Sequence, residues 1–557
     1  MAAWIYPYSA GGSRDALQQL FTLGALSIAS ILLGFNYVSR LLFIPIVTSI
    51  LLVLMTPNPY GSSTTAGLAA IFLLFMAYQV GMRLRRSLGV LTWVLFAIVV
   101  AAFINAIEGL LQWFGLVGSL YEWMVVPELR GVAVGALRQV NLFATFLCVG
   151  SICTAWLVDK KRLTEPMGWF LLSVLMFGVA ASGSRTGILE IVFLASFAIF
   201  YRKQLIKPVK RLFIGQLVIL ILALFFLPQV AKLLDFEFTS GALRTAKVSH
   251  DARWNIWQNS LKMISERPWL GWGWRETGYA QYITLFNNRY QGVLDNVHNL
   301  PLQITLEFGF LISVPFIFCL YSLLFYILPK SISNNKTLGK APVNFDRLYA
   351  WCIVFLIVGI HSLLEYPLWY VGFLFLSGLF LGYLVPLKTV NKPQSAYEVS
   401  SLCGVYLIAA SLLTLAFFGW QQYAKVLPIY KTPFTKNKIE QRALNAPLLL
   451  NASDAWLFRE HLDFAALSST TVTQKNALEV RRLAEKLLHF SAEPHVIQPL
   501  LLSLWYLKDF DALRFHAKRF CLAFPSTFSH WSQQNSVIFT DFNQGYFLTK
   551  ECRPVAP

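Results

Sequence analysis

Charged residues are scarce in this sequence. Asp, Glu, Lys and Arg make up 13% of its 557 residues, whereas 56% are hydrophobic. A soluble globular domain carries roughly 25% charged residues, so a soluble fold is excluded for a chain of this length. The apolar residues also come in blocks, and the blocks at 88–106 and 212–227 contain no acid or base. Blocks of roughly 17–25 apolar residues can cross a bilayer, which predicts a polytopic membrane protein.

Cysteine motifs are also missing, and no cleavable signal peptide is expected. The seven cysteines form no C-x-x-C pair and show no Cys/His spacing, so no metal site is expected from them. The first apolar block, 17–37, lacks a basic flank and a small-residue cleavage site. Cys521 and Cys552 lie in the more polar tail. The sequence allows a disulfide between them but does not require one. The other five are interpreted as small buried hydrophobes: Cys148, Cys153, Cys319, Cys352 and Cys403.

Acidic residues are outnumbered, and the formal net charge is +18. The basic residues sit in short clusters between apolar blocks, which indicates membrane orientation rather than a nucleic-acid partner. A cluster follows each odd-numbered span from the third to the eleventh, so these exits are predicted to be cytoplasmic. About twelve spans are expected: 17–37, 41–55, 66–80, 88–107, 140–158, 167–181, 186–201, 212–227, 300–328, 348–361, 370–386 and 402–420.

The sequence therefore predicts an all-α fold with four parts. Residues 1–227 carry spans 1–8, 228–299 form a large loop on the outer side, 300–420 carry spans 9–12, and 421–557 form a C-terminal helical domain on the outer side. The sequence of the tail predicts pairs of short helices, an arrangement similar to that of helical-repeat domains. Within the loop, Trp254, Trp257, Leu261 and Ile264 recur at helical spacing. This segment is interpreted as an interfacial helix, and an added role as an aromatic platform for a sugar is compatible with that interpretation.

His298 is the candidate general base. Pro301 fits the first turn of a helix, because its missing N–H leaves no hydrogen bond unmade there, and His298 then lies just before the helix. The positive end of the helix dipole disfavours imidazolium, and a neutral imidazole at the membrane surface can accept a proton. A capping or surface role is the alternative. Glu307 lies deeper in the same span, four residues after Gln303 and on the same helix face. A carboxylate within a membrane span is costly and usually has a functional role.

Polar clusters at three places are predicted to face the same loop. Arg185 lies in a very short connection between two spans, and Arg253 begins the amphipathic helix. Arg138, Gln139 and Asn141 open the fifth span. Arginine is the side chain best suited to hold a phosphate through two parallel hydrogen bonds. Snorkelling to the membrane surface is the alternative for each single arginine.

Taken in order, these motifs resemble those of the O-antigen ligase and polymerase superfamily of bacterial inner membranes. Within it, the sequence is most similar to the protein (pilin) O-oligosaccharyltransferase branch. The matching motifs cover roughly residues 130–310. They are Arg138-Gln139-x-Asn141, Ser184-Arg185-Thr186-Gly187, Arg253, the segment 268–273, and the segment 298–303 with Glu307 and Gly309. Beyond them, the segment 361–370 resembles the one typical of the protein-glycosylating branch.

The resemblance implies a GT-C-like membrane glycosyltransferase of the inner membrane, with its active site, loop and tail in the periplasm. The donor would be an oligosaccharide on undecaprenyl pyrophosphate, transferred en bloc and with inversion to a Ser/Thr hydroxyl of a pilin-like protein. His298 would be the catalytic base, and Arg185 and Arg253 would bind the donor pyrophosphate. No metal or other cofactor is expected, because no acidic cluster faces the loop. Supporting roles would fall to Arg138, Gln139, Asn141, Glu307 and Tyr366.

Two alternatives remain at the level of sequence. The first is a ligase that moves O-antigen onto lipid A core, or an O-antigen polymerase. The second is a polysaccharide flippase or transporter, which would show polar or broken helices at mid-membrane and an inverted repeat. The tail is expected to select the protein acceptor, with bracing of the large loop as the alternative.

Overall fold

The computed structural model describes residues 16–35, 47, 49–54, 58–118, 124–127, 130–203, 205–236, 252–286, 293–327, 345–384, 396–431 and 438–535. Within these ranges every regular element is a helix, which confirms the predicted all-α fold. The apolar blocks become helices because a helix satisfies its own backbone hydrogen bonds where lipid offers no partner.

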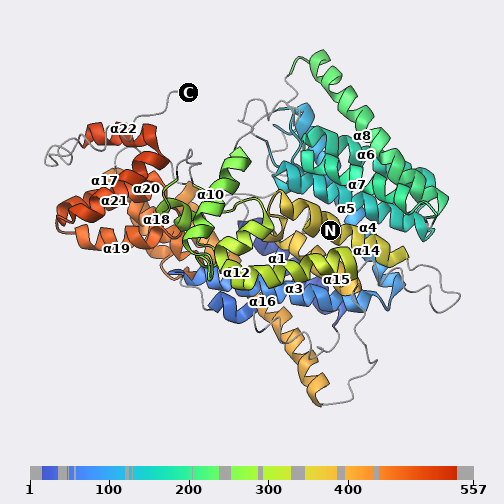
Figure 1. Cartoon of the computed structure of the whole chain (residues 1–557), viewed down its shortest axis with the longest axis horizontal. Coiled ribbons are helices and arrows are strands. Elements are labelled where there is room, and N and C mark those ends of the chain that lie inside the picture. Colours follow the sequence, from blue (N-terminus) through green and yellow to red (C-terminus); the bar gives the residue numbers. More distant parts are fainter. Residues whose placement is uncertain are drawn as a thin grey trace.

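Nine helices among the described residues are long and apolar enough to cross a membrane. They form the elongated bundle that occupies most of Figure 1. They are α1 (Ala16–Leu33), α3 (Gly61–Leu84), α4 (Leu88–Phe114), α5 (Val140–Asp159), α6 (Glu165–Ser182), α8 (Lys207–Leu233), α12 (Leu300–Ser322) continued by η4 (Leu323–Ile327), α14 (Phe345–Val354) continued by η6 (Phe355–Ile360), and α16 (Ala396–Lys431).

The other three expected spans are shorter or only partly described. Helices α7 (Arg185–Phe200) and α15 (Val371–Leu384) have 16 and 14 residues. The expected span at 41–55 lies partly outside the described residues. Several helices run past their predicted ends, since α4 continues to Phe114, α8 to Leu233 and α16 to Lys431. The large loop and the C-terminal domain therefore begin later than the sequence suggested.

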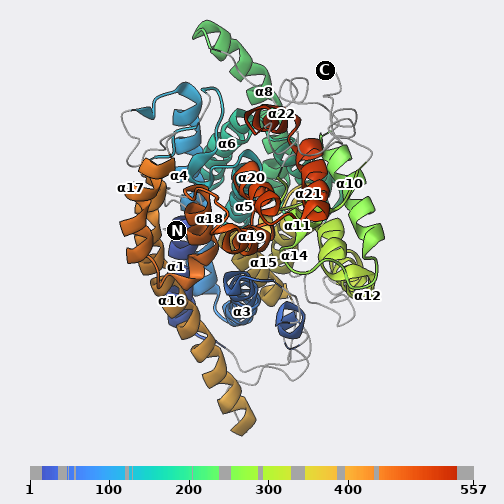
Figure 2. The same cartoon turned by 90° about the vertical axis from the view of Figure 1, so that its left-hand side faces the viewer.

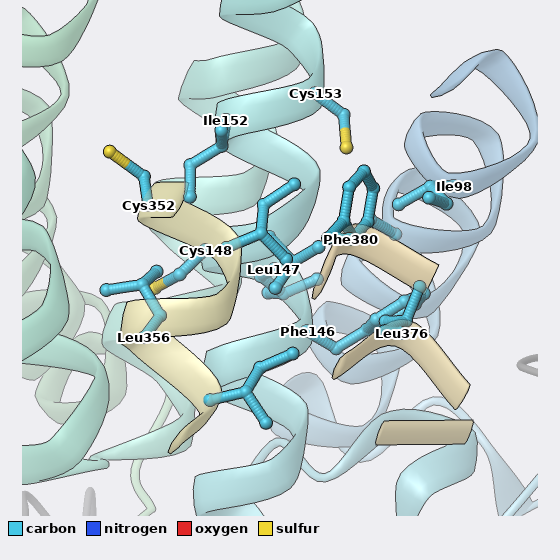
Figure 3. Close-up of a cluster of buried hydrophobic side chains, with 14 of the residues drawn as sticks. Ile98, Phe146, Leu147, Cys148, Ile152, Cys153, Cys352, Leu356, Leu376 and Phe380 are labelled. Atoms are coloured by element: carbon cyan, nitrogen blue, oxygen red, sulfur yellow. The ribbon is translucent and has the colours of Figure 1, made fainter. Parts of the chain in front are cut away.

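Helix α5 is the centre of the membrane region. It contacts α4, α6, α7, α8 and α14, and 89% of its most apolar stretch is buried, the largest share among the nine spans. Figure 3 shows its Cys148 and Cys153, with Cys352 of α14, among apolar side chains. All three thiols are free and fully buried, as predicted. Cys319 and Cys403 are also free but exposed, so the prediction of burial was wrong for these two.

Helix α12 is interrupted where the large loop meets it. Gly309 adopts φ 68° and ψ 176° within the helix, and Gly271 of the loop adopts φ 71°. A Cβ atom on Gly309 would lie 2.2 Å from the Trp269 carbonyl oxygen, and one on Gly271 would lie 2.4 Å from the Glu307 carbonyl oxygen. Only glycine permits this backbone conformation and this approach at both positions.

Hydrogen bonds across this contact replace those that the broken helix loses. The Trp272 N–H donates to the Leu306 carbonyl at 2.9 Å, and the Phe310 N–H donates to the Pro268 carbonyl at 2.7 Å. Non-helical backbone at membrane depth requires partners of this kind. The segment 268–273 therefore fixes the large loop to α12 a few turns from its start.

The large loop contributes two helices, α10 (Ala252–Glu266) and α11 (Thr277–Ile283). Helix α10 is the predicted amphipathic helix. Ile264 is buried with Ile256 and Met263, whereas Trp254 and Leu261 are exposed. The four residues of the predicted apolar face are thus divided between the protein interior and the surface.

The C-terminal domain gathers at one end of the bundle in Figure 1 and faces the viewer in Figure 2. It has its own cluster of buried apolar side chains, which also includes Tyr60 and Tyr282 of the preceding parts. Cys521 is disulfide-bonded, and Cys552 lies outside the described residues. The described helices of this domain are α17 (Lys438–Asn451), α18 (Arg459–Ser468), α19 (Ala477–Leu487), α20 (Pro494–Tyr506), α21 (Phe510–Ala523) and α22 (Pro525–Gln534).

Candidate active site

Glu365 lies in the chain between η7 (His361–Leu363) and η8 (Pro367–Trp369) and is the centre of a polar cluster. The π-helical η6 ends directly before η7, and such turns often mark functional sites. The Glu365 side chain is only 6% exposed. Its Oε2 lies 2.6 Å from His298 Nδ1, and its Oε1 accepts hydrogen bonds from Asn141 Nδ2 at 2.9 Å and from the Arg253 guanidinium.

The partners of Glu365 determine its charge. Burial raises the pKa of the Glu365 carboxyl, but the hydrogen bond from His298 and the nearby charge of Arg253 outweigh burial and hold the pKa below its ordinary value. The group is therefore a carboxylate at neutral pH and accepts the proton on His298 Nδ1. This tautomer leaves Nε2 of His298 to take a proton from another molecule.

The backbone also presents His298. Asn299 is the N-cap of α12 and accepts a hydrogen bond from the Leu302 N–H at 3.1 Å, so His298 lies just before the helix, as predicted. His298 has φ 56°, a left-handed conformation that is uncommon for a histidine and frequent at functional sites. Its ring meets Tyr366 edge to face, with 5.0 Å between ring centroids. Tyr366 is therefore part of the same site.

Asn141 connects the cluster to the turn between α6 and α7. Its Oδ1 accepts a hydrogen bond from the Ser184 hydroxyl at 2.7 Å while its Nδ2 donates to Glu365. Arg185 follows Ser184 and has an exposed side chain. The Arg185 side chain makes no hydrogen bond or ion pair with another described residue, so its guanidinium is available to a ligand.

The other residues predicted at this site have structural contacts. Gln139 is the N-cap of α5, and its Oε1 accepts from the Leu142 N–H at 2.6 Å. Arg138 has φ 62° and joins the short η3 helix (Gly135–Leu137) to α5. Glu307 is 1% exposed and faces Gln303 and the backbone of Arg275 rather than His298.

A second polar layer lies one helical turn deeper. The Thr145 hydroxyl is 2.7 Å from Glu190 Oε1 and 2.7 Å from His361 Nδ1, and all three residues are fully buried. Glu190 Oε2 and His361 Nε2 have no hydrogen-bond partner among the described residues. In the same part of the chain, no group of three or more His, Cys, Asp and Glu could hold a metal ion.

Comparison with known families matches two segments that together contain this site. Residues 143–317 match the family described as O-antigen ligase, and residues 348–537 match the family described as virulence factor membrane-bound polymerase, C-terminal. The first segment carries Arg185, Arg253 and His298, and the second carries Glu365 and Tyr366. These matches support a place for the chain in the O-antigen ligase superfamily.

Relatives of known class agree with this assignment. The general O-oligosaccharyltransferase of Acinetobacter baylyi is 26% identical over 418 residues, 73% of this chain and 68% of the relative. The ComP-specific O-oligosaccharyltransferase of the same organism is 24% identical over 72% of each chain. A putative polysaccharide ligase of Rickettsia conorii is 28% identical over 35% of this chain and 45% of its own length. The two relatives that cover most of this chain are thus both O-oligosaccharyltransferases.

Sequence reasoning missed the role of Glu365. The residue lies within the motif at 361–370, in which the sequence assigns a role only to Tyr366. A carboxylate in an apolar stretch next to a predicted span is costly without a partner, and that signal was present. Its partners could not be found in the same way, because Asn141 is 224 residues and His298 is 67 residues away in the chain.

Proposed function

We propose that this protein O-oligosaccharyltransferase transfers an oligosaccharide en bloc from undecaprenyl pyrophosphate to a Ser/Thr hydroxyl of a pilin-like protein in the periplasm. The arrangement of His298, Glu365 and Arg253 supports this proposal best. It combines a base, an anion that orients the base, and a cation for the leaving group within one cluster.

His298 acts as the general base. A serine or threonine hydroxyl is a weak nucleophile at neutral pH and must lose its proton as it attacks. Nε2 of His298 takes this proton, and Glu365 stabilises the imidazolium that forms. The hydroxyl oxygen then bonds to the anomeric carbon while the bond from that carbon to the pyrophosphate breaks, which inverts the configuration.

Arg185 and Arg253 bind the donor pyrophosphate. The leaving group gains negative charge as its bond to the sugar breaks, and fixed cations stabilise that charge. Arg253 is held at the cluster by Glu365, and Arg185 is exposed and directly follows Ser184, which bonds to Asn141. Because the two guanidinium groups supply the positive charge, the proposed reaction needs no metal.

An apolar cavity beside the site suits the lipid part of the donor. It has a volume of about 580 Å³ and lies between α1, α3 and α12. Leu300, Leu368 and Trp369 line it, and these residues stand next to His298 and Tyr366 in the chain. A polyprenyl chain can bury its surface there while its pyrophosphate reaches Arg253.

The direction of the helices supports a periplasmic site in the inner membrane. Helix α5 runs from Asn141 at the site to a basic end where Lys160 pairs with Asp346 at 2.6 Å. Helix α14 begins at that pair and returns to Glu365. The basic end corresponds to the cytoplasm, so the site lies on the other side. The disulfide-bonded Cys521 suits an oxidising compartment.

The test is a glycosylation assay in a bacterial host that lacks its own O-antigen ligase. The host receives a lipid-linked glycan with either a pilin-like protein or lipid A core as the acceptor. Glycan on the pilin with the wild-type chain, and none with His298→Ala at equal membrane content, is the expected result. Glycan on lipid A core alone would identify a ligase instead, and transfer by His298→Ala at the wild-type rate would exclude this base.

A further inference from the structure

Helix α11 of the large loop is docked into the C-terminal domain. Tyr282 is 3% exposed and belongs to the apolar core of that domain. Its hydroxyl lies 2.8 Å from His516 Nδ1, and the two rings stack. Arg519 donates to the carbonyl of Ile283, the last residue of α11, at 2.9 Å. The C-terminal domain therefore holds the end of α11.

The start of α11 is held by the same domain. Glu276 is the N-cap residue, is 2% exposed, and lies 2.7 Å from His489 Nδ1. The His489 ring also stacks on Tyr279, with 3.9 Å between centroids. Asn58, just before α3, donates to the other Glu276 oxygen at 3.0 Å. Two histidines of the domain thus fix both ends of one short helix.

Helix α11 is connected in turn to α12. The Thr277 hydroxyl accepts a hydrogen bond from Gln303 Nε2 at 2.8 Å, and the same amide nitrogen donates to Glu307 at 2.9 Å. Thr277, Gln303 and Glu307 are each 1% exposed. Both donor hydrogens of the Gln303 amide are used, so its oxygen has a fixed direction.

That oxygen holds the backbone next to the base. Gln303 Oε1 accepts from the Val297 N–H at 2.9 Å, and the Val297 carbonyl accepts from Trp257 at 3.1 Å. The next residue is His298, whose N–H donates to Asn296 at 2.8 Å and whose φ is 56°. A histidine keeps a left-handed backbone conformation only where several surrounding contacts hold the backbone in place.

We infer that the C-terminal domain is a positioning element of the catalytic centre, which sets the geometry of His298 through α11, Gln303 and Val297. This inference rests on the proposed function of His298. It assigns Gln303 as the positioning residue and the pairs Glu276–His489 and Tyr282–His516 as the domain's attachment points. The domain then contributes to the rate of the chemical step for every acceptor, beyond any selection of the acceptor protein.

Kinetic measurements on the full-length protein distinguish a role in positioning His298 from a role in selecting the acceptor protein. Misplacement of a catalytic group by about 1 Å can cost roughly a hundredfold in rate. We expect Gln303→Met to lower kcat by about that factor and His489→Ala by about tenfold, both for transfer to the pilin and for hydrolysis of the lipid-linked donor. KM for the pilin stays unchanged. Arg481→Ala is the matched control, because the ion pairs of Arg481 are with Glu485 and Asp509 of its own domain.

The double variant Gln303→Met/His489→Ala tests whether the two residues act along one route. Positioning predicts that it is no slower than Gln303→Met alone, because the first change already breaks the connection. Multiplied losses would overturn the inference, and so would a higher KM for the pilin with an unchanged hydrolysis rate.

Hydrogen exchange gives a result that does not depend on activity. Faster exchange at the Val297 amide is expected in Gln303→Met and in His489→Ala, and the wild-type rate is expected in Arg481→Ala. If the Val297 amide stays equally protected in His489→Ala, the inference fails even where the proposed function holds. If wild-type protein glycosylates no pilin but the exchange pattern appears, the proposed function fails and the structural connection stands.

Discussion

Two polar layers of this membrane protein are built from the same three parts of the chain, one helical turn apart. The outer layer contains Ser184, Asn141 and Glu365, and the inner layer contains Glu190, Thr145 and His361. Each has a carboxylate, a small polar residue of α5 and a hydrogen bond across the bundle. The two layers differ in the side chains that their carboxylates contact.

The outer carboxylate faces a cation and the base, and the inner one does not. Glu365 binds Arg253 and His298, which keep it ionised beside the proposed base. Glu190 contacts the Thr145 hydroxyl, and its second oxygen has no partner among the described residues. The comparison indicates that the outer layer serves the reaction, and that the inner layer fixes the helices that carry it.

Glu365→Gln should have the largest effect. An amide cannot accept the Nδ1 proton of His298 with the same strength or stabilise imidazolium, so kcat should fall by roughly a hundredfold or more. Glu190→Gln is the matched change in the inner layer and should keep kcat within about twofold. Donor hydrolysis and pilin glycosylation by purified protein measure both. Equal losses in the two variants would remove the distinction between the layers.

The two arginines should respond differently to replacement by lysine. Lysine keeps the charge but loses the planar pair of donors, so Arg253→Lys should lower kcat roughly tenfold to a hundredfold. Arg185 is exposed and separate from Glu365, and Arg185→Lys should mainly raise KM for the lipid-linked donor. Initial rates over a range of donor concentrations distinguish these outcomes. Full activity of both lysine variants would mean that only a diffuse positive charge is needed.

Asn141→Leu should cost about tenfold in kcat, which corresponds to about 1.4 kcal/mol. The change removes one of the hydrogen bonds to Glu365 and the acceptor of the Ser184 hydroxyl, but His298 and Arg253 keep Glu365 in place. Ser184→Ala is the control and should have a smaller effect, because it leaves the Asn141 bond to Glu365 intact. A loss as large as that of Glu365→Gln would mean that Asn141 itself touches the substrate.

The sequence predicted the parts of the site better than their connections. Apolar blocks and basic loops indicated most spans, and the helix start at Pro301 placed His298 correctly before its helix. The sequence showed neither the break of α12 at Gly309 nor the inner layer, because both depend on contacts between distant segments. Thr145 and Glu190 lie within apolar spans, where a threonine gives little signal and the glutamate partner is 45 residues away.

The smallest change in activity is expected for Thr145, and it tests the inner layer alone. Thr145→Val keeps the shape of the side chain but removes the hydroxyl between Glu190 and His361. Two more buried polar atoms then lack a partner, and an unsatisfied buried group costs about 1–3 kcal/mol. The variant should therefore unfold at a lower temperature in detergent while kcat for glycan transfer stays within about twofold. Thr145→Ser restores the hydroxyl and should recover most of the lost thermal stability. If Thr145→Val instead lowers kcat as strongly as Glu365→Gln with unchanged stability, the inner layer takes part in the reaction, and the division between the two layers is wrong.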